Sequence, residues 1–340
     1  MKKTLYFIIV GMICLVAVAQ AQSYYVPDVL GGRFEQHVYS LPDDYHGKVV
    51  ATLVREKADT ISQRAILYIH GYNDYFFQEE MAQQFVDSGF NFYALDLRKY
   101  GRSILPGQYP FEVRDLSEYF TEIDSAVCTI KNEGNKEIVL MGHSTGGLIT
   151  SLYCDERKNN LPVNGLILNS PFLEWNFNAT YRNFLIPLVS WLGSFMPDAT
   201  LADEKNPSVY GQSLLKDYHG EWTFNTDWKM LQAPGQRFSW IRAIDKGHDR
   251  VHAGLDIPCP VLVLFSGKSI SGEKWSPEFQ QADAVLNVDD IARYGLLLGN
   301  DVEEVSIAGG LHDLVLSRKD VRRSVYHIIF KWMTDKELMQ

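Results

Sequence analysis

The chain has 340 residues, of which 46% are apolar and 22% charged, and its formal net charge is −10. These proportions are typical of a globular enzyme and exclude a disordered or fibrous chain. The acidic excess also argues against nucleic acid as a partner, because binding to phosphates requires a surface rich in lysine and arginine. The length suits one large domain that carries an insertion.

The first 21 residues have the pattern of a cleavable secretory signal peptide. Lys2 and Lys3 give a positive start, an apolar run covers 5–18, and small residues suit cleavage after Ala19 or Ala21. The apolar run is short and poorly flanked for a membrane span. We therefore expect a secreted or periplasmic protein, with an uncleaved anchor helix as the alternative.

The mature chain would keep three cysteines, Cys128, Cys154 and Cys259. Their spacing is wide and includes no CxxC pair, so neither a zinc ribbon nor a thioredoxin motif is indicated. Cys128 and Cys154 fall in predicted helices, where a thiol usually behaves as a small apolar side chain. One disulfide bond in an oxidising compartment remains an open alternative.

Short apolar runs alternate with helical patterns along the rest of the chain. Runs this rich in Val, Ile, Leu, Phe and Tyr are typical of strands buried on both faces of a mainly parallel sheet. The alternation indicates right-handed βαβ units, and so an α/β fold with helices on both faces of an eight-stranded sheet. The expected strands cover 37–40, 48–55, 65–70, 90–95, 137–141, 163–169, 260–265 and 302–307, and the expected helices cover 78–88, 113–132, 145–159, 288–298 and 318–335.

The segment between 170 and 260 breaks this alternation, because it has no clear strand and is too long for a simple connection. It is crowded with Trp, Tyr and Phe. We interpret residues 171–259 as a helical cap inserted after the sixth strand, over a core formed by 22–170 and 260–340. Most of its aromatic rings should pack the cap onto the core, and some should face a site beneath it.

The stretch Gly142-His143-Ser144-Thr145-Gly146 follows an expected strand directly and opens an expected helix. G-x-S-x-G in this context is typical of a nucleophile turn, in which the glycines relieve crowding around a strained serine at a helix N-terminus. We predict that Ser144 is the nucleophile and that His143 is structural. A turn of small residues in which Ser144 only caps the helix is the alternative.

A serine hydroxyl needs a general base at neutral pH. His312 follows the last expected strand and the pair Gly309-Gly310, on a loop that can reach back to the serine. We predict that His312 is this base. His248 and His252 are spaced i, i+4, as metal ligands on a helix can be, but no carboxylate motif accompanies them and we expect no metal.

An acid should orient the histidine. In the order serine, acid, histidine it follows the strand at 260–265. Asp283 lies on the loop that leads into the next helix, whereas Asp289 and Asp290 suit the first turn of that helix. We favour Asp283. The loop that leads to it from the strand at 260–265 is unusually long. The candidates in this region are Glu273, Asp283, Asp289 and Asp290.

Two backbone amides should bind the oxyanion. One belongs to Thr145, the residue after the nucleophile. The other should lie in His70-Gly71-Tyr72-Asn73, directly after a strand, where Gly71 lets the backbone approach closely. We predict Tyr72 as the second donor through its main chain, with an ordinary turn as the alternative.

Together these motifs resemble the α/β-hydrolase superfamily, and more narrowly its monoacylglycerol lipase, lysophospholipase and serine aminopeptidase-like (S33) group. The resemblance covers about residues 35–335 and implies the triad Ser144, Asp283 and His312, with an oxyanion donor on the first glycine-containing loop. It also implies a largely structural role for Asp96–Ser103. That group usually carries its acid on a short loop, which here is extended. The matching stretches are His70-Gly71, Asp96–Ser103 (DLRKYGRS), Gly142–Gly147 and Gly310–Asp313.

These residues predict a two-step acyl transfer that needs no cofactor. The aromatic cap favours an esterase or lipase-like enzyme for apolar, small-molecule or lipid-like acyl esters, with transient contact between the cap and a membrane or lipid. One alternative is an aminopeptidase-like peptidase, and another is a hydrolase-fold binding protein without catalysis. The peptidase would need a cap carboxylate for the substrate amine, from Asp198, Asp203, Glu204 or Glu221.

Overall fold

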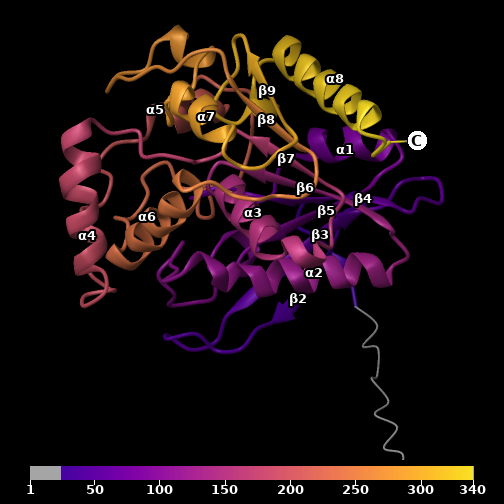
Figure 1. The fold of residues 1–340 in the computed structure, drawn as a ribbon, viewed down its shortest axis with the longest axis horizontal. Helices are drawn as coiled ribbons and strands as arrows, with labels where there is room; N and C mark the ends of the chain where they lie inside the picture. The colour runs from indigo at the N-terminus through magenta and orange to yellow at the C-terminus, as the bar shows by residue number, and fades with distance from the viewer. Residues whose placement is uncertain (1–23, 340) are drawn as a thin grey trace, which may run out of the picture.

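The computed structural model describes residues 24–339, and a nine-stranded sheet runs through them (Figure 1). The strand order is β1-β2-β3-β5-β4-β6-β7-β8-β9. The pairs from β5 to β9 are parallel, whereas β1, β2 and β3 join the sheet in antiparallel fashion. The strands are β1 (Val26–Pro27), β2 (Glu35–Ser40), β3 (Val50–Glu56), β4 (Arg64–Ile69), β5 (Asn91–Asp96), β6 (Glu137–His143), β7 (Gly165–Asn169), β8 (Val261–Ser266) and β9 (Val302–Ile307).

Eight of the strands coincide with the eight expected runs, so the mostly parallel α/β sheet is confirmed. The count differs by one because β1 adds a two-residue strand at the edge, pairing Val26 and Pro27 with β2. Both residues are exposed, and a proline is tolerated only where no ladder amide is needed. An exposed edge strand has no apolar run, which is the signal that identified the others.

Helices cover both faces of the sheet. α1 (Glu79–Asp87) and α8 (Lys319–Asp335) lie on one face, and α2 (Phe120–Asn132), α3 (Thr145–Glu156) and α7 (Val288–Gly295) lie on the other (Figure 1). Successive residues of a strand contribute to the hydrophobic cores on opposite faces of the sheet, because side chains alternate along a strand. In β4, Leu67 belongs to the α2–α3 side and Tyr68 to the α1–α8 side. Short 3-10 turns cover Gly101–Ser103, Leu116–Tyr119, Lys158–Asn160, Pro277–Gln280 and Leu314–Leu316.

The residues between β7 and β8 form the helical cap. It contains a π-helical turn (Tyr181–Leu185), α4 (Ile186–Leu192), α5 (Val209–Leu214) and α6 (Phe238–His252). α4 is outermost, and α6 packs between α4 and α3 (Figure 1). Side chains of α4 and α6 join the core on the α2–α3 face, while Leu214 of α5 joins the core on the opposite face. The cap thus reaches over the end of the sheet and is anchored on both sides of it.

The expected signal peptide, residues 1–21, lies outside the described residues. Across residues 24–339, no helix has both the length and the apolar character that a membrane crossing requires. Cys128, Cys154 and Cys259 are free thiols in this part of the chain. A hydrogen bond with Cys259, together with burial, raises the pKa of the Cys154 thiol.

Candidate active site

Ser144 lies at the sharp turn between β6 and α3, with φ at 53°. This left-handed backbone conformation is strained for any residue other than glycine, and it is the conformation found at nucleophile turns. The flanking glycines make room for it. A Cβ on Gly142 would lie 2.5 Å from Thr150 Oγ1, and a Cβ on Gly146 would lie 2.3 Å from the His70 carbonyl oxygen. The sequence pattern therefore reflects close backbone approach around the serine.

His312 lies on the loop after β9, next to Asp283. Its Nδ1–H donates to Asp283 Oδ2 at 2.8 Å, which leaves Nε2 free for another partner. Asp283 Oδ1 accepts the amides of Val285 and Leu286, each at 2.8 Å. The carboxylate is fully buried and fixed through both oxygens. It can therefore hold one tautomer and one orientation of the imidazole.

The long loop before Asp283 closes on itself. The Asp283 amide donates to the Lys268 carbonyl at 2.9 Å, and the Ile270 amide donates back to the Asp283 carbonyl at 2.8 Å. Residues 271–282 are thus an excursion, and Asp283 lies beside the end of β8, where a short loop would place it. The excursion reaches the cap, because Gln280 Nε2 donates to the Ser213 carbonyl at 2.8 Å.

The other acids considered at this position lie elsewhere. Glu273 is exposed within the excursion. Asp289 and Asp290 occupy the first turn of α7. Asp290 pairs with Arg182 of the cap at 3.0 Å. Among the four candidates, the structure places only Asp283 against His312.

Both predicted oxyanion donors border Ser144. The Thr145 amide belongs to the first turn of α3, whose N–H groups have no partner within the helix. The loop after β4 passes beside the serine, since a Cβ on Gly71 would lie 3.0 Å from Ser144 Cβ. Within residues 24–339, the Tyr72 amide donates no hydrogen bond. Its side chain packs between Phe111 and Trp240, with ring centroids 5.1 and 4.5 Å away.

Two buried residues fix the start of this loop. The Leu97 amide donates to His70 Nε2 at 3.1 Å, so the proton is on Nδ1, which donates to the Gly71 carbonyl at 2.8 Å. Burial lowers the pKa of His70 and keeps the ring neutral. Asp96 accepts the Phe76 amide at 2.9 Å through its side chain. The stretch from Asp96 thus braces the loop, as its expected structural role implies.

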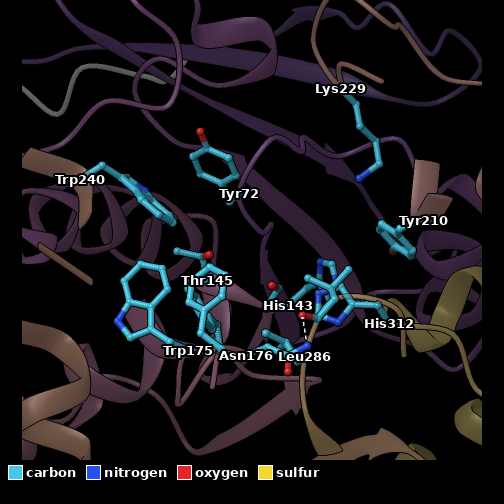
Figure 2. Close-up of a pocket in the computed structure, with 14 residues that line it drawn as sticks. Tyr72, His143, Thr145, Trp175, Asn176, Tyr210, Lys229, Trp240, Leu286 and His312 are labelled. Atoms are coloured by element: carbon cyan, nitrogen blue, oxygen red, sulfur yellow. Dashed lines mark hydrogen bonds between the residues drawn. The ribbon is translucent and has the colours of Figure 1, made fainter. Parts of the chain in front are cut away.

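A cavity of about 250 Å³ lies over Ser144, between the core and the cap. Figure 2 shows Trp175 and Trp240 on one side of it, with Tyr210 and Lys229 on the other. Most of its lining is aromatic or aliphatic. The complete lining is Tyr72, His143, Ser144, Thr145, Phe172, Trp175, Asn176, Phe177, Tyr210, Lys229, Trp240, Val285, Leu286 and His312.

Comparison with known proteins agrees with the fold. The sequence matches the model of the serine aminopeptidase S33 family over residues 60–268, which is more than half of the chain. The chain belongs to this family. The resemblance noted from the motifs is therefore confirmed, and the protein is an α/β-hydrolase. No curated protein matches the sequence.

Solved structures share the fold of this hydrolase. A monoglyceride lipase from Saccharomyces cerevisiae, solved with a substrate analogue, is 16% identical with a TM-score of 0.66, covering 88% of this chain and 96% of its own. A monoacylglycerol lipase from Paleococcus ferrophilus is 17% identical with a TM-score of 0.59, covering 88% and 99%. Est1E from Butyrivibrio proteoclasticus, bound to ferulic acid, is 15% identical with a TM-score of 0.55, again covering 88% and 99%.

A buried polar cluster adjoins Ser144 in this hydrolase. Lys229 Nζ of the cap lies 2.8 Å from Asp74 Oδ1, and Asp74 Oδ2 lies 3.4 Å from His143 Nδ1. Burial raises the pKa of Asp74, but Lys229 and His143 outweigh it and hold that pKa below its usual range. Asp74, His143 and Asp313 are close enough to surround a metal ion, and the Lys229 ammonium pairs with one member of this group, Asp74.

Asp74 carries little signal in the sequence pattern, and Lys229 carries none. Asp74 follows the β4 strand end, which is a common place for functional side chains in α/β folds. Lys229 lies in a cap segment without periodicity, and it meets Asp74 155 positions away in the chain. Only the folded arrangement brings the two together.

The pair His248 and His252 has a structural role in α6. His248 Nε2 donates to the Phe172 carbonyl and His252 Nε2 to the Leu173 carbonyl, both at 2.9 Å. Two histidines one helical turn apart therefore bind two consecutive carbonyls at the start of the cap. These two hydrogen bonds to the backbone account for the i, i+4 spacing of the histidines.

Proposed function

We propose that this hydrolase is a secreted serine esterase that cleaves carboxylic esters of apolar acyl groups, in the manner of a monoacylglycerol lipase or lysophospholipase. The observation that carries the proposal is that Ser144 and His312 line the same mostly apolar cavity under an aromatic cap. Cavities with this lining favour apolar ligands, and a few polar groups orient them.

The mechanism follows from the contacts. His312 Nε2 takes the proton of Ser144 as its oxygen attacks the ester carbonyl, and Asp283 stabilises the imidazolium that forms. The amides of Thr145 and Tyr72 donate hydrogen bonds to the oxyanion. His312 then protonates the leaving alcohol and, as base again, activates the water that hydrolyses the acyl-enzyme. These residues complete each step without a cofactor.

The family name raises peptidase activity as a second candidate, and the charges on the cavity wall favour the ester. An aminopeptidase needs a carboxylate to hold the substrate amine, whereas the described lining holds no carboxylate and contains Lys229. The four cap acids have other partners. Asp198 pairs with Arg237, Glu221 pairs with Arg322, and Asp203 and Glu204 accept the amides of Gly235 and Ala233.

The outer surface of the cap supports a lipid-like substrate. Apolar side chains recur there every three or four positions along the π-helical turn and α4, and Trp191 is 58% and Phe195 69% exposed. Phe177 is half-exposed and also lines the cavity, so this surface is continuous with the site. We propose that it contacts a lipid surface transiently. We call it the outer cap face, and it comprises Phe177, Tyr181, Phe184, Leu185, Leu188, Trp191, Phe195 and Met196.

Secretion is proposed from the pattern of residues 1–21 alone. Mass spectrometry of the protein recovered from an export-competent host should then find a chain that begins at Gln20 or Gln22. A chain that retains Met1 would indicate an uncleaved anchor.

Labelling with a fluorophosphonate tests the catalytic proposal, because the reagent reacts with an activated serine whatever the acyl substrate. We expect stoichiometric labelling of the wild type and none of Ser144→Ala. A panel of acyl esters of increasing chain length, beside aminoacyl amides, then tests the substrate class. Absence of labelling would leave the binding-protein alternative, and cleavage of amides without esters would favour the peptidase.

A further inference from the structure

The loop that carries Tyr72 is held by the cap as well as by the core. Asn73 Nδ2 donates to the Met230 carbonyl at 2.7 Å, and the Met230 amide donates to Asn73 Oδ1 at 2.7 Å. The side-chain amide of Asn73 thus pairs with both the backbone N–H and the backbone carbonyl of one cap residue, as the backbone of a neighbouring strand would. We call cap residues 225–231 the cap tether.

The next two loop residues contact the cap tether too. Asp74 forms its ion pair with Lys229 at 2.8 Å, where both side chains are buried. The Asn225 amide donates to the Tyr75 hydroxyl at 2.8 Å. The rings of Tyr75 and Trp228 meet edge to face with centroids 5.2 Å apart. Three consecutive loop residues are therefore fastened to one short segment of the cap, and Figure 2 shows Lys229 reaching toward the cavity from this side.

The position of Asn73 explains why these contacts matter for chemistry. Asn73 directly follows Tyr72 in the chain, and its φ is 48°, a left-handed conformation that asparagine tolerates better than most residues. The Tyr72 amide is separated from the Asn73 side chain by a single peptide unit. Any relaxation of φ at Asn73 therefore reorients the preceding peptide groups, and an oxyanion donor must be held within a few tenths of an ångström.

We propose that Asn73 is a positioning residue, through which the cap tether sets the Tyr72 amide in the oxyanion hole. The proposal rests on the proposed function, since it needs an oxyanion to be stabilised. It implies that the cap does more than cover the substrate. Displacing the cap tether from Asn73 would loosen one of the two oxyanion donors, so that acyl transfer is efficient only when the cap is seated.

The decisive substitution is Asn73→Gly. Glycine adopts a φ of 48° without strain, so the variant keeps the backbone conformation available while losing both bonds to Met230. We expect kcat to fall about 10- to 100-fold, with KM changed by no more than about twofold, because the lost interaction acts mainly in the transition state. The fluorophosphonate labelling rate should fall in parallel, because its phosphoryl oxygen uses the same donors.

Two further variants make the test specific. Tyr75→Phe removes only the bond from Asn225 and keeps the contact with Trp228, so it should lower kcat by no more than about threefold. Asp227→Asn changes an exposed residue of the cap tether and should leave kcat and the labelling rate unchanged. Melting temperatures of all variants report whether the fold is retained.

Wild-type labelling and turnover by Asn73→Gly would overturn the proposal. Equal losses in kcat, in substrate affinity and in melting temperature would also overturn it, because they would indicate general loosening of the cap. A wild type that labels fully but hydrolyses amides in place of esters would refute the ester assignment alone. The comparison of labelling rates between variants would still stand in that case.

Discussion

The two walls of the cavity are built in different ways. The core wall consists of Ser144, Thr145 and His312, each placed by a turn or loop that follows a parallel strand of the sheet. The cap wall consists of large side chains such as Trp175, Trp240 and Lys229, placed by contacts between segments far apart in the chain. The core wall depends on local backbone geometry, whereas the cap wall depends on the whole tertiary structure.

This difference separates chemistry from access. In the proposed reaction, groups on the core wall act on the reacting atoms, so small displacements there would change the barrier. Groups on the cap wall act on which substrate is bound and on how the loop after β4 is held. We therefore expect changes in the core wall to have the largest effects on turnover, changes at the base of the cap to affect stability, and changes on its outside to affect only encounter with substrate.

The largest effect is expected for Asp283→Asn. Asparagine can no longer stabilise the His312 imidazolium or hold the Nδ1–H tautomer, so kcat should fall by about 10⁴-fold while KM changes little. Steady-state kinetics on one soluble ester measures this. Asp289→Asn, on the exposed first turn of α7, is the matched control. A loss below about tenfold would move the orienting role away from Asp283.

A smaller effect, on stability, is expected at the base of the cap. Burial lowers the pKa of His248 to about 3, from an ordinary value of 6.5. Between these values the unfolded chain binds a proton that the folded chain excludes, so the free energy of unfolding falls as the pH falls. The slope contributed is at most about 1.4 kcal/mol per pH unit.

Urea unfolding of His248→Gln between pH 7 and pH 4 tests this, because glutamine does not titrate and keeps an N–H donor for the Phe172 carbonyl. The variant should lose that part of the slope. His327→Gln, on the exposed side of α8, should keep it. If both variants have the wild-type slope, His248 is not the group that resists protonation.

The smallest effect is expected on the outer cap face. The double substitution Trp191→Ser, Phe195→Ser should lower binding to neutral phospholipid vesicles by about tenfold, because it removes apolar area that the lipid would cover. Turnover of a soluble short-chain ester should be unchanged. Ile61→Ser removes a fully exposed apolar side chain on the core and should leave vesicle binding as it is. Equal vesicle binding by all three proteins would exclude the outer cap face as the lipid contact.

The sequence predicted the core wall better than the cap wall, for the same physical reason. Eight strands and the turn at Ser144 follow from local patterns of apolar residues and glycine. His312 followed from its place after the last strand, and Asp283 was selected from four acids without any view of how its long loop closes. The bond between Asn73 and Met230 joins positions 157 apart, and no periodicity records such a contact. The edge strand at Val26 was missed because exposed residues carry no burial pattern.

The closed loop before Asp283 has a consequence for exchanging parts between hydrolases. Gln280 and Trp275 of its excursion bind Ser213 in α5, so the segment that ends at the acid also holds the cap. A cap grafted from a relative with a short acid loop would meet none of these partners. The unit of exchange is therefore the cap together with residues 268–283, and a chimera that transfers the cap alone would disturb the position of Asp283 itself.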